Sequence, residues 1–233
     1  MISGKKYFQF ESSSARAKLR LVKNKILPAI FVGVFALSRM PGLMPQNFSV
    51  AYAFMFCAGV FFPRRLVWWL PLATLLVTDI GLNFYYQHQY PDENVWSAEN
   101  LANLSFNYLA YLALIFLGRK FKPQDSIIKL ASGGILGAIL FYLITNTASW
   151  FFNPFHNPEY TRTFAGWLLA LTKGIGGYPT TLEFFRNTLL SGGIFTAFFA
   201  AAAKFTPAES PADKTGGARE PQAEAEPEEA KAQ

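Results

Sequence analysis

Charged residues are scarce in this sequence, and their scarcity argues against an ordinary soluble domain. Asp, Glu, Lys and Arg make up 15% of the 233 residues, against about 25% in typical soluble proteins. Hydrophobic residues make up 52% and aromatic residues 17%. Between residues 26 and 204 the chain alternates long apolar runs with short polar interruptions. Because apolar runs of about 20 residues become helices in lipid, this pattern predicts an all-α membrane protein.

Cysteine and histidine are also rare, which excludes several kinds of site. Cys57 is the only cysteine and lies within an apolar run, so no disulfide framework or cysteine metal site is available. His88 and His156 lie in predicted loops, far in sequence from any carboxylate pair. The chain has no ATP-binding motif, and its glycine-rich segment 174–177 precedes no strand–helix unit that would cradle a phosphate. We therefore expect no enzymatic activity, no metal site and no cofactor.

Six apolar runs are long enough, or nearly so, to cross a membrane. They span residues 26–44, 48–62, 66–85, 101–117, 127–152 and 184–203. A seventh run, 164–172, rises only about 14 Å and cannot cross a hydrocarbon core of about 30 Å. We expect this short run to be an interfacial or re-entrant segment between the fifth and sixth helices. Small residues in those two helices predict close contacts between helices.

The distribution of Lys and Arg predicts the orientation of the six helices. With the amino end in the cytoplasm, the inner segments hold seven, two, four and four basic residues, and the outer segments hold one, none and three. Because basic residues favour the cytoplasmic side, both ends are predicted to be cytoplasmic. The predicted location is the cell inner (plasma) membrane, as a multi-pass protein. The Ser- and Arg-rich opening also resembles an organelle transit peptide, so an organelle membrane is the alternative.

Three regions follow from this pattern. Residues 1–25 form a basic cytoplasmic segment, for which membrane orientation is favoured over nucleic-acid binding because aromatic residues are not interleaved. Residues 26–204 form the six-helix transmembrane domain. Residues 205–233 are rich in Pro, Ala and Glu and are predicted to be a disordered cytoplasmic tail, since they have too little apolar surface to bury.

Polar residues within the apolar runs are costly in lipid and suggest a site. Under the predicted topology, seven of them gather in the outer half of the bundle: Arg39, Asn47, Asp79, Asn83, Asn146, Arg186 and Asn187. One interpretation is that they are solvated or snorkelling at helix ends, with Asn47 as a helix cap. The other is an outward-open pocket in which Asp79 and Arg186 neutralise each other, while Asn47, Asn146 and Asn187 offer hydrogen-bond donors and acceptors. The inner halves of the helices carry almost no such residues, whereas simple end effects would populate both sides.

Three tryptophans, Trp96, Trp150 and Trp167, are predicted to lie at the same outer boundary. One interpretation is an aromatic belt at the membrane interface, where indole rings are enriched. The other is stacking on an aromatic or heterocyclic ligand. The sequence leaves both interpretations open.

Several segments together resemble a family of uncharacterised bacterial integral membrane proteins. They are Pro-Gly-Leu-Met-Pro-Gln-Asn-Phe-Ser at 41–49, Ala-Phe-Met-Phe-Cys-Ala-Gly at 53–59, Thr-Asp at 78–79, Thr-Asn at 145–146 with Trp150, and Phe-Phe-Arg-Asn-Thr-Leu-Leu-Ser at 184–191. The resemblance covers about residues 26–200. The chain departs from the expected pattern at Ser49-Val50, where Ser/Thr-Pro is expected.

That family is similar in architecture to the substrate-binding S components of energy-coupling-factor vitamin transporters. The resemblance implies six helices, inward termini and an outward-facing ligand pocket. It implies ligand-binding roles for Asn47, Asp79, Asn146, Trp150, Arg186 and Asn187. It also implies a docking surface for an energising membrane subunit, formed by Ala53, Cys57, Ala58 and Gly59, although their spacing is not the usual Ala-x-x-x-Ala.

We therefore expect a protein that binds a small metabolite or vitamin-like substrate from the outer side, for uptake with a partner subunit. The expected partners are the lipid bilayer, an unidentified small molecule and that subunit, with no nucleic acid. The alternative is a non-transporting membrane scaffold or assembly protein that uses its Gly and Ala helix faces. An intramembrane enzyme is the third interpretation.

Overall fold

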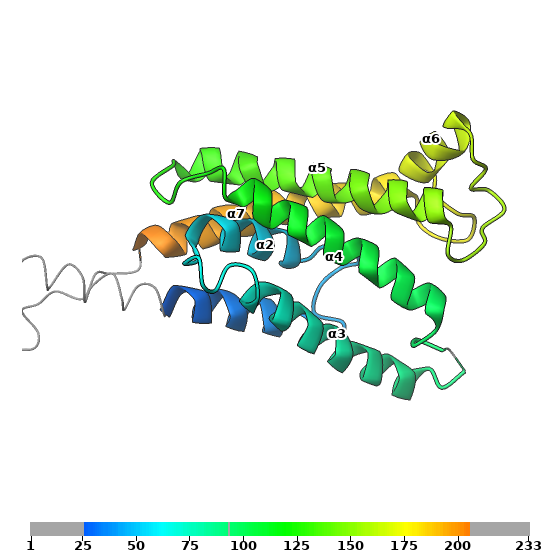
Figure 1. Cartoon of the computed structure of the whole chain (residues 1–233), viewed down its shortest axis with the longest axis horizontal. Helices are drawn as coiled ribbons and strands as arrows, with labels where there is room; N and C mark the ends of the chain where they lie inside the picture. The colour runs from blue at the N-terminus through cyan, green and yellow to red at the C-terminus, as the bar shows by residue number, and fades with distance from the viewer. Residues whose placement is uncertain (1–25, 93, 206–233) are drawn as a thin grey trace, which may run out of the picture. The chain divides into compact units, whose positions relative to one another are not determined.

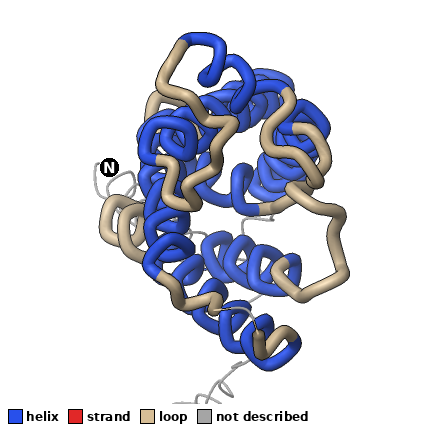
Figure 2. Tube along the Cα trace, turned by 90° about the vertical axis from the view of Figure 1, so that its right-hand side faces the viewer, coloured by secondary structure: helices blue, strands red, loops and turns tan. Residues whose placement is uncertain are grey.

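The computed structural model describes residues 26–92 and 94–205, and this part of the chain consists of helices and connecting loops (Figures 1 and 2). The predicted basic segment, 1–25, lies outside the described part, and so does the predicted disordered tail, 205–233, except for Phe205, which is the last residue of a helix. These two described ranges contain no strand. The prediction of an all-α chain is confirmed for these residues.

Seven helices make up the described part. The first helix is Ile26–Ser38. It is followed by α2 (Ala51–Phe61), α3 (Leu70–Gln89), α4 (Ala98–Gly118), α5 (Ile127–Phe152), α6 (Phe164–Thr172) and α7 (Thr181–Phe205). Three of them, α4, α5 and α7, are long and apolar enough to cross a membrane, whereas the first helix and α2 are apolar but shorter. The chain is therefore a membrane-like helical protein with three candidate spans in its described part.

The first two helices are shorter than predicted, and the loop between them explains the difference. The first helix ends at Ser38 rather than near residue 44, because Pro41 cannot continue a helix and Gly42 has φ 79°. Asn47 has φ 57°, a left-handed conformation that asparagine tolerates better than most residues. Helix α2 therefore starts only at Ala51 and has 11 residues, or about 16 Å of rise.

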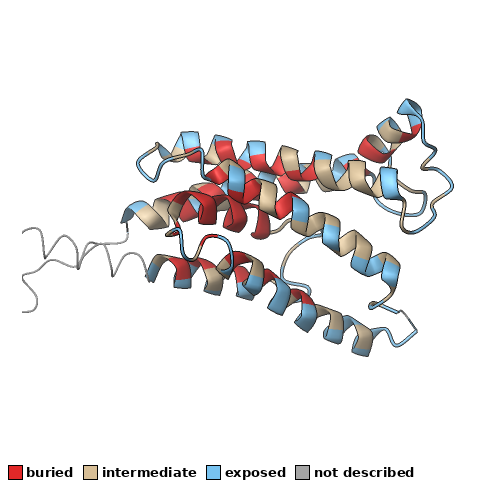
Figure 3. Cartoon of the chain, in the orientation of Figure 1, coloured by how far each residue is buried: buried red, intermediate tan, exposed pale blue. Residues whose placement is uncertain are grey.

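Helix α2 is the centre of the fold. Every residue from Ala51 to Val60 is buried, and the helix packs against α4, α5 and α7. The first helix packs against another side of α2. The ring of its Phe35 stacks on the ring of Phe54, with 4.8 Å between the two centroids. Figure 3 shows the buried residues concentrated on α2 and on the parts of its neighbours beside it.

Glycines allow the closest helix contacts, as predicted for the small residues of the fifth and sixth runs. A Cβ on Gly134 of α5 would lie 2.6 Å from the carbonyl oxygen of Gly192 on α7. A Cβ on Gly59 of α2 would lie 2.3 Å from the carbonyl oxygen of Ile115 on α4. Both distances are too short for a methyl group, so the helix backbones can approach only because these positions are glycine.

The predicted docking surface on α2 is wrong for this conformation. Ala53, Cys57 and Ala58 have no exposed surface, and Gly59 is buried as well. These small residues face other helices of the same chain. They therefore serve the internal packing of the fold and are not available to a partner subunit.

Candidate binding cavity

A cavity of about 650 Å³ lies beyond the amino-terminal end of α2. Its walls come from the first half of α4, the second half of α5, the first half of α7 and the loops on both sides of α6. The buried residues of α4 begin only at Ala110, and those of α5 end at Tyr142. Because α2 is about half as long as α4 and α5, it fills the interior at one end and leaves the other end open.

Helix α4 contributes a row of three asparagines to the cavity wall. Asn100, Asn103 and Asn107 all line the cavity. Their spacing of three and then four residues places them on one face of the helix. The helix begins at Ser97, whose hydroxyl accepts a hydrogen bond from the Asn100 backbone N–H at 3.2 Å and so fixes where this face starts.

None of these three asparagines is among the site residues predicted from the sequence. The predicted fourth helix starts at residue 101, so Asn100 falls into the preceding loop. Asn103 and Asn107 nevertheless interrupt an apolar run at helical spacing. Polar side chains at helical spacing within an apolar run are the signal that could have identified them.

Helix α5 provides the facing wall, and its polar side chains are partly engaged. The Asn146 side-chain amide donates to the Tyr142 carbonyl at 2.9 Å, which leaves its Oδ1 oxygen without a partner among the described residues. The Ser149 hydroxyl donates to Oδ1 of Asn103 at 3.3 Å and links α5 to α4. The Tyr142 hydroxyl donates to the Leu171 carbonyl and ties α5 to α6. Side-chain hydrogen bonds thus connect α5 to α4 and to α6 at the cavity wall.

Aromatic side chains complete the wall. The rings of Tyr52 and Phe141 meet edge to face at 4.8 Å, and Tyr142 stacks on Phe185 at 4.1 Å. Further lining residues are Phe155, Tyr160, Tyr178 and Phe184. Burial raises the pKa of Tyr160, and the neighbouring Glu159 raises it further, so the phenol remains neutral at physiological pH.

The cavity wall carries no full charge. Its lining within the described part of the chain contains asparagine, serine, threonine, tyrosine and apolar residues, and no Asp, Glu, Lys, Arg or His. Polar groups in this wall therefore act through neutral hydrogen bonds. Such a wall suits a ligand that is polar but uncharged.

The loop before α7 closes one side of the cavity and depends on glycine. Gly174 and Gly177 have φ of 73° and 86°, which other residues rarely adopt. Helix α7 then starts with a capping box in which the Thr180 hydroxyl accepts from the Glu183 backbone N–H at 3.3 Å. The Glu183 carboxylate accepts in turn from the Thr180 N–H at 2.7 Å. This start places Thr181 at the cavity wall.

A second cavity of about 350 Å³ adjoins the first. It lies between the loop that precedes α2, helix α3 and helix α4. The two cavities share four lining residues: Asn47, Tyr52, Asn107 and Phe141. The two cavities therefore lie next to each other, with these four side chains in contact with both.

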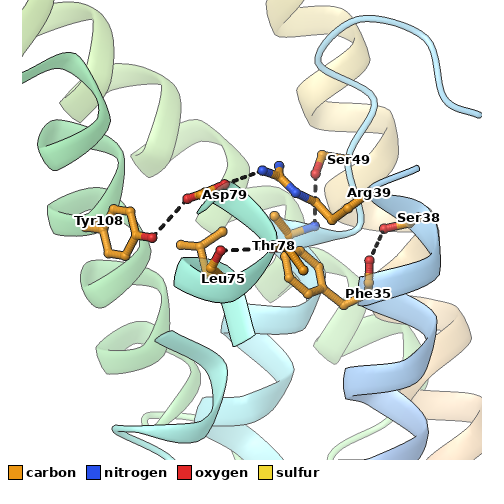
Figure 4. A network of polar contacts seen from close by, with 9 residues as sticks. Phe35, Ser38, Arg39, Ser49, Leu75, Thr78, Asp79 and Tyr108 are labelled. Carbon is orange, nitrogen blue, oxygen red and sulfur yellow. Dashed lines mark hydrogen bonds and ion pairs between the residues drawn. The ribbon is translucent and has the colours of Figure 1, made fainter. Parts of the chain in front are cut away.

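An ion pair between Arg39 and Asp79 lies at the edge of the second cavity. Arg39 lines it, and its guanidinium donates to Oδ1 of Asp79 on α3. The Tyr108 hydroxyl of α4 donates to Oδ2 of the same carboxylate at 2.9 Å. Figure 4 shows Asp79 between Arg39 and Tyr108. The carboxylate therefore joins three segments of the fold and neutralises Arg39.

The predicted pair between Asp79 and Arg186 is wrong. The partner of Asp79 is Arg39, at the carboxyl end of the first helix, whereas Arg186 is exposed on α7. The sequence pattern predicts that Arg39 and Arg186 both lie in the outer half of the membrane. Depth along the membrane normal does not reveal which helices are neighbours, and the first helix proves to be the neighbour of α3.

The six predicted ligand-binding residues lie in different surroundings. Asn47 and Asn146 line the larger cavity, whereas Asp79, Trp150, Arg186 and Asn187 do not. The Trp150 indole donates to the Thr161 carbonyl at 2.7 Å. The Asn187 side-chain amide donates to the Gln46 carbonyl at 2.9 Å and so ties the loop that carries Asn47 to α7. Asn187 therefore positions the cavity wall without forming part of it.

A family model described as "Family of unknown function (DUF6580)" matches residues 20–213 of the chain. No curated protein matches the chain, and no solved structure matches it. The matched range includes every described residue and therefore the lining of both cavities.

Proposed function

The chain belongs to the DUF6580 family, whose function is unknown, and we propose that it binds a small polar molecule in the cavity between α4, α5 and α7. The observation that carries this proposal is the combination of volume and lining. A space of about 650 Å³ is within the range of small-molecule sites, and its wall combines asparagine side chains with aromatic rings. The cavity is partly open, so a small molecule could enter it and meet hydrogen-bonding groups and aromatic rings together.

The proposed setting is a multi-pass protein of the cell inner membrane with both ends in the cytoplasm. Basic residues occupy the loops at the end of the bundle away from the cavity, including Arg64, Arg65, Arg119 and Lys120. The positive-inside tendency would put that end in the cytoplasm and the cavity on the outer side. Besides the three candidate spans, this topology requires the first helix, α2 and α3 to lie within the membrane.

The proposed role is capture of a metabolite or vitamin-like compound for uptake with an energising partner subunit, which is the role implied by an architecture like that of S components. The described helices support this role through a cavity at one end of the bundle and tight packing at the other. The scaffold alternative loses part of its support, because Gly59 and Gly134 are engaged in contacts within the chain. No reaction step is proposed for the intramembrane enzyme alternative.

A thermal-shift screen of the purified chain against small metabolites tests binding. A compound present at about 100 times its dissociation constant stabilises the folded state by about 2.7 kcal/mol. Asn107→Leu removes a carboxamide from the cavity wall, and we expect it to weaken binding about tenfold. Asn83→Leu is the matched control, since Asn83 lies on α3 and lines neither cavity.

Two results would reject the proposal. One is a panel in which no compound stabilises the protein. The other is a stabilising compound whose affinity falls equally in Asn107→Leu and Asn83→Leu, because such a compound binds elsewhere. Cysteine-accessibility labelling checks the topology separately: cysteine at Asn157, beside the cavity, should react from outside intact cells, and cysteine at Lys122 only after permeabilisation.

A further inference from the structure

The charges near the cavity restrict which molecules can enter it. The larger cavity has no charged lining residue in the described chain, and the second cavity has Arg39, which Asp79 already neutralises. A carboxylate, phosphate or ammonium group would lose part of its hydration there without gaining an opposite charge. That exchange is unfavourable. The surroundings therefore select against ligands with a net charge.

The unpaired hydrogen-bonding groups of the wall indicate the polar part of the ligand. Asn103 uses its Oδ1 for Ser149, so its amide N–H groups remain as donors. Asn146 uses its amide nitrogen for Tyr142, so its Oδ1 remains as an acceptor. Asn107 makes no side-chain hydrogen bond to any other described residue and offers both kinds of group. Donors and acceptors are thus present on two facing helices.

A carboxamide side chain matches one type of partner particularly well. Its C=O and N–H can form two parallel hydrogen bonds with a molecule that presents N–H beside C=O, as in a lactam, a ureide or another carboxamide. The rings of Tyr52 and Phe141 at the cavity wall provide faces and edges for a planar group. A flat, uncharged, amide-bearing compound satisfies both features at once.

We propose that the ligand of this cavity is an uncharged planar compound with an amide-like edge, recognised by Asn103, Asn107 and Asn146. This inference rests on the proposed binding function and specifies its ligand class. It distinguishes the site from one for a sugar, which is also uncharged but offers hydroxyl groups in place of the amide edge. It also distinguishes the site from one for anionic cofactors or nucleotides.

Pairs of small probes that differ in one property test the ligand class. Nicotinamide and nicotinate share a ring and differ in charge; 2-pyridone and N-methyl-2-pyridone share a carbonyl and differ in the N–H beside it. Methyl β-glucoside represents an uncharged sugar. Saturation-transfer difference NMR on the full chain in nanodiscs measures weak binding of all five, with titrations to obtain dissociation constants.

We expect nicotinamide to bind at least about tenfold more tightly than nicotinate, and 2-pyridone more tightly than its N-methyl derivative by about fivefold. Asn107→Leu should reduce both differences, whereas Asn83→Leu should leave them unchanged. Nicotinate binding as tightly as nicotinamide, or methyl β-glucoside binding more tightly than either amide, would overturn the ligand class while leaving small-molecule binding in place. If none of the five probes gives a signal that Asn107→Leu alters, the ligand class is rejected, and the thermal-shift panel decides separately whether the cavity binds another small molecule.

Discussion

The Arg39–Asp79–Tyr108 network makes a sharp prediction about stability. The side chains of Arg39 and Asp79 are 23% and 8% exposed, so the carboxylate is almost fully desolvated. Removing one partner of a buried ion pair costs about 3–5 kcal/mol because the other charge stays buried without compensation. Since Arg39 keeps some exposure, we take the lower end and expect about 3 kcal/mol for Asp79→Asn or Arg39→Gln.

The double variant separates a paired interaction from two independent effects. If the two side chains acted independently, Asp79→Asn with Arg39→Gln would lose about 6 kcal/mol, the sum of the single losses. Because the double variant leaves no uncompensated charge, we expect it to lose no more than either single variant. Arg186→Gln is the matched control, since Arg186 is exposed on α7 and does not contact Asp79.

Cys57 provides the assay. It is the only cysteine of the sequence and is fully buried, so a thiol-reactive dye labels the protein only as it unfolds. For a chain of this size a loss of 3 kcal/mol corresponds to a fall in midpoint temperature of about 6–12 °C. Additive losses in the Asp79→Asn, Arg39→Gln double variant would refute the pair. So would equal recovery when Asp79→Asn is combined with Arg186→Gln.

Three further variants test the packing and the cavity wall. Gly134→Ala should cost about 2 kcal/mol in the same dye assay, because its Cβ would lie 2.6 Å from a carbonyl oxygen of α7; Gly33→Ala, with nothing within 4 Å, should not destabilise. Tyr142→Phe loses the bond to the Leu171 carbonyl and should cost about 1 kcal/mol. Asn187→Leu frees the Gln46 carbonyl, and hydrogen exchange across 40–49 should accelerate about fivefold, while unchanged exchange would show that the loop is held by other contacts.

Helix positions were predictable where the chain carries its own end signals. The predicted runs 127–152 and 164–172 match α5 and α6 at both ends. Each helix begins with a side-chain cap, from Ser126 and Thr163 respectively, and α5 ends at Asn153 in a left-handed conformation. At these ends the capping residues coincide with the ends of the apolar runs. The positions of the helix ends therefore depend little on the tertiary fold.

The first two helices were overestimated because hydropathy does not register backbone conformation. The segment between them is moderately apolar and contains Met40, Leu43 and Met44, so an apolar run appears to continue. Pro41 and Pro45 and the positive φ values of Gly42 and Asn47 nevertheless break the helix. The prolines are visible in the sequence and give more information here than the apolar residues do.

Neighbour relations could not be predicted from this sequence. The depth of a residue in the membrane follows from its number in a helix, at about 1.5 Å per residue. This depth predicts that the polar residues lie at one end of the bundle. The lateral order of helices depends on packing, which for this chain is decided by glycines such as Gly59 and Gly118 on α2 and α4. The partner of Asp79 and the cavity face of α4 both depend on that order.

The existence of the cavity follows from the short central helix. A full-length helix in the position of α2 would continue past Ala51 into the space beside Asn107 and Asn146, which are lining residues. The left-handed Asn47 and the bond from Asn187 to Gln46 instead turn the chain aside at that point. The same loop lines the second cavity and carries Arg39 at its start. One irregular segment thus ends the packed core, opens the polar space and holds the ion pair that fixes α3 in place.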